Sequence, residues 1–249
     1  MDIRTQKALA WSGPLSLVLT ISALDITGFV PLPSLAMPSP TASAEQIAVF
    51  YRGHGLAICV GAIVFMVSAA VYLGFIAVLS AQIKRIEGGR RTFTYLQLAA
   101  GAASMTPLIV TPLAWCVAAF RPEHNPEVIQ AFNDLAFITM LMVTPLAVVQ
   151  VLAVGLAILS DKRAQPIFPR WVAHASFVCA LGLQVGVLCV LTRTGPFAWD
   201  GAITGTLDNL IMPWTILMCV MILKAIKRQE AEAAGQGADA NPRGVLTAR

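Results

Sequence analysis

Charged residues are scarce in this sequence. They make up 12% of its 249 residues, well below the roughly 25% of an ordinary soluble domain, while 57% of the residues are hydrophobic. A soluble chain of this length cannot bury so much apolar surface in one core. The shortage of charge therefore excludes an ordinary soluble domain and indicates that lipid surrounds much of the chain.

Histidine is rarer still, with three residues at unmatched depths: His54, His124 and His174. An intramembrane haem needs two facing histidines, and a di-iron or copper site needs a cluster of them. The sequence also has no Walker, GxSxG or HExxH motif. Its five cysteines lie in apolar segments without a CxxC pair, which is typical of packing residues. We therefore expect no metal, no cofactor and no catalytic residue of these classes.

Apolar runs long enough to cross a bilayer, about 20 residues each, recur along the chain. They predict an all-α fold, a polytopic transmembrane helical bundle of six spanning helices. The bundle fills residues 1–228, and a disordered cytoplasmic tail follows over 229–249. The predicted spanning helices are 9–31, 56–82, 94–119, 136–159, 171–192 and 207–226.

Basic residues divide unequally between the two sets of alternate loops. One set contains Arg52, Arg121 and Arg193, and the other contains fourteen Lys and Arg residues. Because positive charge concentrates on the cytoplasmic side, both termini are predicted to be cytoplasmic. The basic residues sit at helix ends rather than along one stripe, so no nucleic-acid partner is expected. The more basic set comprises Arg4, Lys7, Lys84, Arg85, Arg90, Arg91, Lys162, Arg163, Arg170, Lys224, Lys227, Arg228, Arg243 and Arg249.

Two segments with the same pattern indicate an internal repeat. Glu45–Phe50 and Glu127–Phe132 both read Glu-x-Ile-x-x-Phe, and each precedes a predicted span that runs from the outside inward. A duplicated helical hairpin with this direction would give a parallel repeat. Chance similarity between apolar helices is the alternative.

Charged side chains near the outer helix ends form the candidate site. Asp25 is the deepest, roughly 9 Å by helix rise below the predicted helix end at Pro31. An ionised carboxylate in hydrocarbon costs at least a few kcal/mol, so Asp25 is expected to face the bundle interior. The set predicts either a polar pocket that opens outward or an ion-pair collar that locks the helix ends. The candidate ligand-binding residues are Asp25, Arg52, His54, Asp134, Arg193, Asp208 and Asn209.

Proline interrupts several predicted spans. Thr-Pro-Leu begins at Thr106, Thr111 and Thr144, and another proline lies in the last span. Each proline frees a carbonyl one turn earlier, which a threonine hydroxyl can satisfy. The pattern predicts stable kinks or, alternatively, a cavity framed by the kinked helices. Residues 32–43 and 194–206 are predicted to cap the outer mouth of the bundle.

Three strings resemble a known protein family. They are Leu-Ser-Asp-Lys-Arg at 159–163, Phe-Pro-Arg-Trp at 168–171 and Thr-Gly-Pro-Phe-Ala-Trp-Asp-Gly at 194–201. They resemble an uncharacterised family of bacterial six-helix integral membrane proteins, and the resemblance covers helices two to six. It implies a multi-pass protein of the bacterial cytoplasmic (inner) membrane and carries no activity or ligand.

These features lead to three functional hypotheses. The first is a membrane protein whose outward-facing, polar-ended pocket binds or transports a small hydrophobic or amphipathic molecule. The second is an accessory or structural subunit of a membrane complex, for which small-residue faces such as Gly61–Ala62 and Ala99–Ser104 are suited. The third is a membrane enzyme that uses His54 with Asp25 or Asp134 for acid–base chemistry. The expected partners are lipid, a hydrophobic small molecule, and a membrane protein or a second copy of the chain.

Overall fold

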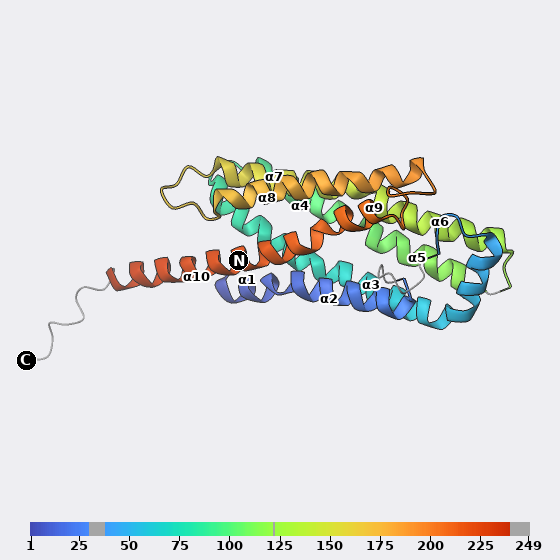
Figure 1. The fold of residues 1–249 in the computed structure, drawn as a ribbon. Helices are drawn as coiled ribbons and strands as arrows, with labels where there is room; N and C mark the ends of the chain where they lie inside the picture. Colours follow the sequence, from blue (N-terminus) through green and yellow to red (C-terminus); the bar gives the residue numbers. More distant parts are fainter. Residues whose placement is uncertain (30–37, 122, 240–249) are drawn as a thin grey trace, which may run out of the picture.

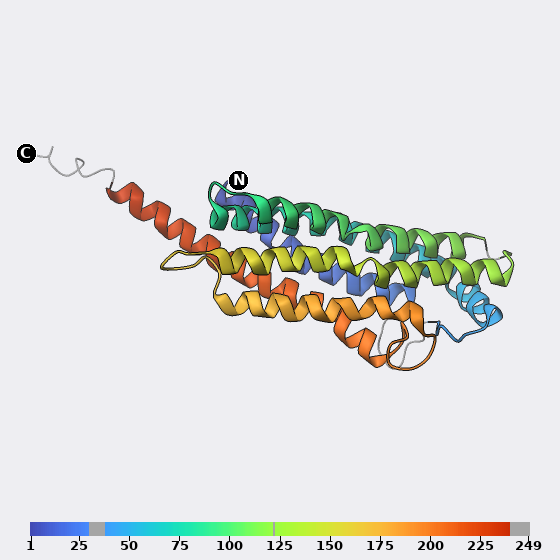
Figure 2. The same cartoon turned by 90° about the horizontal axis from the view of Figure 1, so that it is seen from above.

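The computed structural model describes residues 1–29, 38–121 and 123–239, and all secondary structure in these residues is helical. Within them, six helical segments are long and apolar enough to cross a membrane, which confirms the predicted all-α architecture. They form an elongated bundle whose two chain ends lie toward the same end (Figures 1 and 2). The segments are Ile3–Thr27, Ala44–Glu87, Thr92–Phe120, Pro126–Ser160, Arg170–Leu191 and Ala202–Ala234.

Most of these segments consist of two or more shorter helices. Among the described residues, only the second segment is one continuous α-helix, α3 (Ala44–Glu87). The others are divided into α1 (Ile3–Ala10) and α2 (Ser12–Thr27); α4 (Thr92–Ala103) and α5 (Thr106–Phe120); α6 (Pro126–Met142) and α7 (Thr144–Ser160); α8 (Arg170–Leu183) and the 3₁₀ helix η1 (Gln184–Leu191); and α9 (Ala202–Leu207), η2 (Asp208–Leu210) and α10 (Ile211–Asp239).

Two of the interruptions lie directly before Thr-Pro pairs. Pro107 is the second residue of α5, a position where a missing backbone N–H is tolerated. The carbonyl that it leaves free, that of Ala103, accepts a 2.7 Å hydrogen bond from the Thr106 hydroxyl. At the start of α7, the Thr144 hydroxyl donates in the same way to the carbonyl of Leu141, at 2.9 Å. The predicted interruptions are confirmed at both places, and at each a threonine hydroxyl bonds to the carbonyl that the proline leaves free.

The helix ends on the outer side differ from the sequence prediction. α2 ends at Thr27 because Gly28 adopts a left-handed conformation, with φ of 75°. The predicted helix end at 30–31 lies outside the described residues. α3 begins well before the predicted residue 56, because Ser43 and Gln46 form a reciprocal capping box.

The C-terminal segment corrects a further prediction. α10 continues to Asp239, although the sequence predicts disorder from residue 229 on. Alanine and glutamate, which are frequent in this stretch, are strong helix formers. An ion pair of 2.7 Å between Lys7 and Glu230 also ties α10 to α1. Residues 240–249 lie outside the described ranges.

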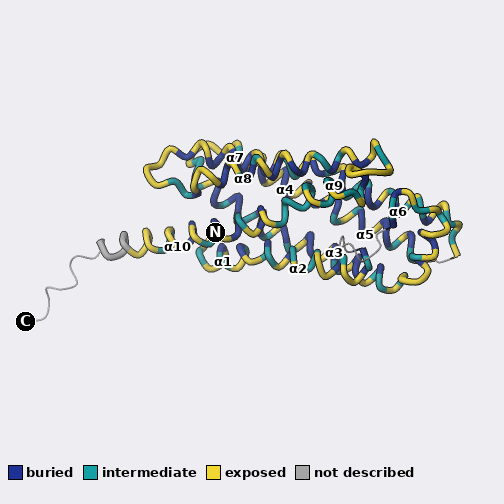
Figure 3. Tube along the Cα trace, in the orientation of Figure 1, coloured by how far each residue is buried: buried dark blue, intermediate teal, exposed yellow. Residues whose placement is uncertain are grey.

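The outer surface of the bundle is apolar. Leu56 and Leu191, for example, are 81% and 78% exposed, and further exposed hydrophobic residues occur along the helices. Exposed and buried positions alternate around each helix (Figure 3). In water a continuous apolar surface of this kind would cause association. It is the surface that helices in contact with acyl chains require.

The interior contains two packed clusters of side chains. The inner cluster lies toward the chain ends and includes Phe75 and Trp214, while the outer cluster includes Tyr51, Trp115 and Phe137. Both clusters draw on several spanning segments. Residues of both clusters line the cavity described below.

α2 and α3 pack at very close range around Gly61. A β-carbon at this position would lie 2.7 Å from the carbonyl oxygen of Ala23 and 2.4 Å from the Thr27 methyl group. Small residues permit such backbone contact between membrane helices. Gly53, on the same helix, has open space around its hypothetical β-carbon.

We therefore predict opposite effects for two glycine substitutions in α3. Gly61→Ala should lower the free energy of unfolding by about 1–3 kcal/mol through overpacking. Gly53→Ala should leave it unchanged or raise it by up to about 1 kcal/mol, because alanine favours helix. Unfolding of the purified variants in mild detergent measures both changes. Equal effects at the two positions would contradict the close packing at Gly61.

Candidate functional site

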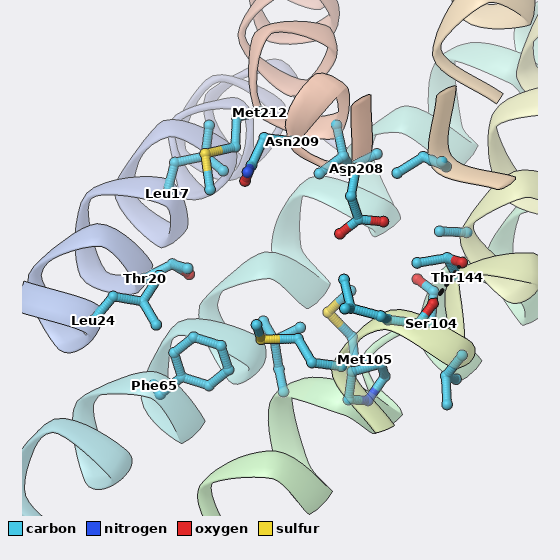
Figure 4. Close-up of a pocket in the computed structure, with 18 of the residues that line it drawn as sticks. Leu17, Thr20, Leu24, Phe65, Ser104, Met105, Thr144, Asp208, Asn209 and Met212 are labelled. Atoms are coloured by element: carbon cyan, nitrogen blue, oxygen red, sulfur yellow. Dashed lines mark hydrogen bonds between the residues drawn. The ribbon is translucent and has the colours of Figure 1, made fainter. Parts of the chain in front are cut away.

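A cavity of about 210 Å³ lies at the centre of the bundle. All six spanning segments contribute to its wall, and Figure 4 shows how their side chains converge on it. Three of the breaks in the helices face this space: Ser104 and Met105 separate α4 from α5, Val143 separates α6 from α7, and Asp208 and Asn209 belong to η2. The break at Trp11, between α1 and α2, does not. The cavity therefore lies where the spanning helices are interrupted.

Most of the cavity wall is apolar. Aliphatic, aromatic and methionine side chains make up its larger part, and they come from both packed clusters and from α2. In Figure 4, Leu17 and Leu24 lie on one side of the space and Met105 on the other. The apolar lining residues are Leu17, Leu24, Phe29, Phe65, Met105, Pro107, Leu108, Phe137, Met140, Leu141, Val143, Ala147, Leu183, Ile211 and Met212.

Several polar groups line the cavity. Gln150 of α7 is 1% exposed, and its Oε1 accepts a 3.4 Å hydrogen bond from the Ser104 hydroxyl. Its Nε2 and the Oδ1 of Asp208 are buried without a hydrogen-bond partner in the described part of the chain. An unpaired buried polar group costs about 1–3 kcal/mol. Both residues line the cavity, although these two atoms are themselves covered by protein.

Two aromatic rings that line the cavity, those of Trp199 and Phe137, stack on each other. The Trp199 ring stacks on the Phe137 ring, with centroids 5.5 Å apart and planes 16° apart. Trp199 Nε1 donates a 3.1 Å hydrogen bond to the carbonyl of Pro38. Pro38 and Trp199 belong to the two predicted cap segments, 32–43 and 194–206. In the residues that the structure describes, these two segments therefore meet beside the cavity.

Two of the predicted site residues line the cavity. Asp208 and Asn209 both contribute to its wall, and the Asn209 amide donates to the carbonyl of Gly205. Figure 4 shows the Asp208 carboxylate directed into the cavity, toward the side where Ser104 and Thr144 lie. The sequence predicts Asp208 near an outer helix end. In the structure, the break at η2 in the sixth segment turns its side chain toward the cavity.

The expectation that Asp25 faces the interior is wrong. Its side chain is exposed and does not line the cavity. α2 ends at Thr27, so Asp25 lies in the last helical turn rather than well below the helix end. A carboxylate at this position needs no partner inside the bundle, because headgroups and water can reach it.

The remaining predicted residues lie outside the cavity, near the outer end of the bundle. Arg52 and His54 are exposed on α3; an Arg52 guanidinium N–H donates to the His124 carbonyl at 3.3 Å. The His54 imidazole bonds to the carbonyl of Phe50, one turn earlier, and stacks on its ring. No hydrogen bond or ion pair within the described residues joins His54 to an aspartate.

Asp134 and Arg193 also stay apart from the cavity. Asp134 is half-buried on α6 and accepts a 3.4 Å hydrogen bond from its neighbour Asn133. The exposed Arg193 lies close enough to act on it electrostatically. No ion pair within the described residues joins Asp134 to Arg193, so these two residues form neither the predicted pocket nor the predicted ion-pair collar.

The predicted site set did not include several lining residues that the structure brings together. Ser104 and Thr144 flank the breaks before proline, and that pattern is visible in the sequence. Trp199 belongs to the unusual Phe-Ala-Trp string of the last outer connection. Nothing in the sequence, however, indicates that Gln150 faces the same space as Asp208.

Comparison with known proteins adds no assignment. No protein-family model matches the chain, and neither a curated protein nor a solved structure matches it. Among the described residues, no group of three or more His, Cys, Asp or Glu side chains could hold a metal ion. The function has to be inferred from the geometry of the cavity.

We predict different costs for removing two buried amides, one with a short hydrogen bond and one with only a long, 3.4 Å bond. Asn133→Leu should lower the free energy of unfolding by about 1–3 kcal/mol, because the buried Tyr51 hydroxyl loses its 3.2 Å acceptor. Gln150→Met should change it by less than about 1 kcal/mol, since Gln150 Nε2 has no partner to lose. Unfolding in mild detergent measures both. A large loss for Gln150→Met would show that this amide is structural.

Proposed function

We propose that this protein is a multi-pass protein of the bacterial inner membrane that binds a small, largely apolar molecule at the centre of its bundle. The observation that carries the proposal is the central cavity, with its apolar wall and its unpaired buried groups on Gln150 and Asp208. Ligand sites are typically of this kind, with apolar walls and a few convergent polar groups.

The size of the cavity limits the ligand. A cavity of about 150 Å³ holds one benzene molecule, and this one is about 210 Å³. It therefore suits one aromatic ring or a short branched chain with a small polar arm. A whole phospholipid is far too large.

The interrupted helices favour transport over static binding. In many transporters the substrate lies beside discontinuous helices near the middle of the membrane. Here α4–α5, α6–α7 and η2–α10 are interrupted around the cavity. Passage to the outer side would require Trp199 to leave its stack on Phe137.

We place the other two hypotheses second. Of the two surfaces predicted for a partner subunit, Gly61 and Ala62 are buried and Gly61 packs against α2 of the same chain, whereas Ala99, Ala102 and Ala103 are exposed. His54, offered as an acid–base catalyst, is exposed and bonded to its own helix rather than to Asp25 or Asp134. Binding in the cavity is therefore the function we propose.

A cavity-filling substitution tests the proposal. Ala147 lines the cavity, and Ala147→Phe should reduce the affinity for a small aromatic probe such as phenethyl alcohol at least tenfold by occupying the space. Ala102 is exposed on α4 away from the cavity, so Ala102→Phe is the matched control and should bind normally. Calorimetric titration of both variants in nanodiscs of zwitterionic lipid, corrected for empty nanodiscs, measures the affinities. Equal binding by the two variants would contradict the proposal.

The same proposal includes the orientation, with both termini in the cytoplasm. Basic connections meet at the end of the bundle that carries the chain termini: Arg163 donates to the carbonyl of Arg85, and Arg228 donates to Gln165. Such a concentration of positive charge is typical of the cytoplasmic face.

Cysteine labelling of intact cells checks this orientation. With the five native cysteines replaced by alanine, a cysteine at Thr194 should react with an impermeant maleimide added outside. A cysteine at Gln165 should react only after the membrane is permeabilised. The reverse pattern would place the basic end outside and overturn the orientation.

A further inference from the structure

The charges around the cavity have one sign. Asp208 is its only carboxylate among the described lining residues, and no lysine, arginine or histidine of that part of the chain contributes to the wall. Residues 30–37, outside the described ranges, contain no ionisable side chain in the sequence. An anionic ligand would therefore meet a like charge and no compensating base.

Asp208 lacks a partner of its own. Its Oδ1 is buried without a hydrogen-bond donor, and no charged side chain in the described residues acts on it electrostatically. The titratable neighbours are the thiols of Cys179 and Cys189 on the fifth segment, which carry no positive charge. A buried carboxylate is normally paired, because desolvation of an isolated ion is expensive.

The fold leaves room for this carboxylate. Gly186 of η1 lies against it, so closely that a β-carbon there would be 2.7 Å from Asp208 Oδ1. The carboxylate points into the cavity (Figure 4) rather than toward an outer loop. Because Oδ1 packs against Gly186, the other carboxylate oxygen, Oδ2, is the one that can accept a hydrogen bond from a molecule inside the cavity.

Aromatic rings complete an environment that suits a cation. Phe29, Phe65, Tyr72, Phe137 and Trp199 all line the cavity. The negative face of an aromatic ring attracts a cation, and more strongly when water is excluded. Apolar walls, ring faces and one unpaired carboxylate together match a molecule with an apolar body and a positive end.

From these observations we infer that the ligand is a small lipophilic amine, bound as its ammonium ion with the N–H groups directed at Asp208. This inference rests on the proposed function and specifies the chemical class of its ligand. Asp208 then sets the charge preference, while the cavity wall binds the apolar body. Neutral molecules of the same shape bind more weakly, and anions bind weakest.

Three probes of nearly equal shape test this inference. Phenethylammonium, phenethyl alcohol and phenylacetate share one ring and differ in the charge of the polar arm. Calorimetric titration in nanodiscs of zwitterionic lipid, corrected for empty nanodiscs, gives the three affinities. The wild-type protein should bind phenethylammonium at least tenfold more tightly than phenethyl alcohol, and phenylacetate least.

The variant Asp208→Asn should abolish the preference for the cation while it retains the binding of phenethyl alcohol. Asp25→Asn, a change to an exposed acid outside the cavity, is the matched control and should keep the wild-type ratio. If Asp208→Asn fails to fold, the inference is decided by the wild-type protein alone, from the ratio of its affinities for phenethylammonium and phenethyl alcohol.

The failures of the inference and of the proposed function are distinguishable. Equal affinities of the wild-type protein for the cation and the alcohol would overturn the inference and leave cavity binding intact. A cation preference that persists in Asp208→Asn would also overturn it. Absence of binding by all three probes would overturn both.

Discussion

Backbone groups freed at a helix break must be satisfied inside the protein, because lipid offers no hydrogen bonds. The structure meets this constraint at several breaks with neighbouring side chains. The Ser104 hydroxyl donates to the carbonyl of Gly101, and the Thr144 hydroxyl donates to that of Leu141. Residues at the breaks of the third, fourth and sixth segments line the cavity, whereas Trp11, at the break of the first segment, is 61% exposed.

Buried polar side chains are paired in some places and unpaired in others. Trp214 Nε1 donates to the Ser176 hydroxyl, whereas Gln97 Nε2 and Trp115 Nε1 have no partner among the described residues. At the cavity, Asp208 keeps a buried oxygen without a partner. An unpaired carboxylate costs stability, and the proposed recognition of a cation would account for this cost.

The two aspartates of the predicted site show where sequence reasoning succeeds and fails. Asp25 and Asp208 both interrupt apolar runs, so hydropathy treats them alike. Gly28 ends α2 two residues after Asp25 and leaves that carboxylate exposed, while the 3₁₀ turn of η2 directs Asp208 inward. The depth of a residue in a membrane depends on where its helix ends. Which way the residue faces depends on helix rotation, and neither quantity is a property of composition.

The sequence by itself determined the helical class, the spanning segments and the breaks before Thr106 and Thr144, because apolar length and proline act locally along the chain. α5 and α10, however, continue through Pro112 and Pro213. It also carried the charge asymmetry between the two ends. Only the tertiary structure decided that kinks from separate segments meet at one cavity, that Trp199 lines it, and that Gln150 and Asp208 share it. These are contacts between residues far apart in sequence, and they depend on how six apolar helices of similar composition are packed and rotated.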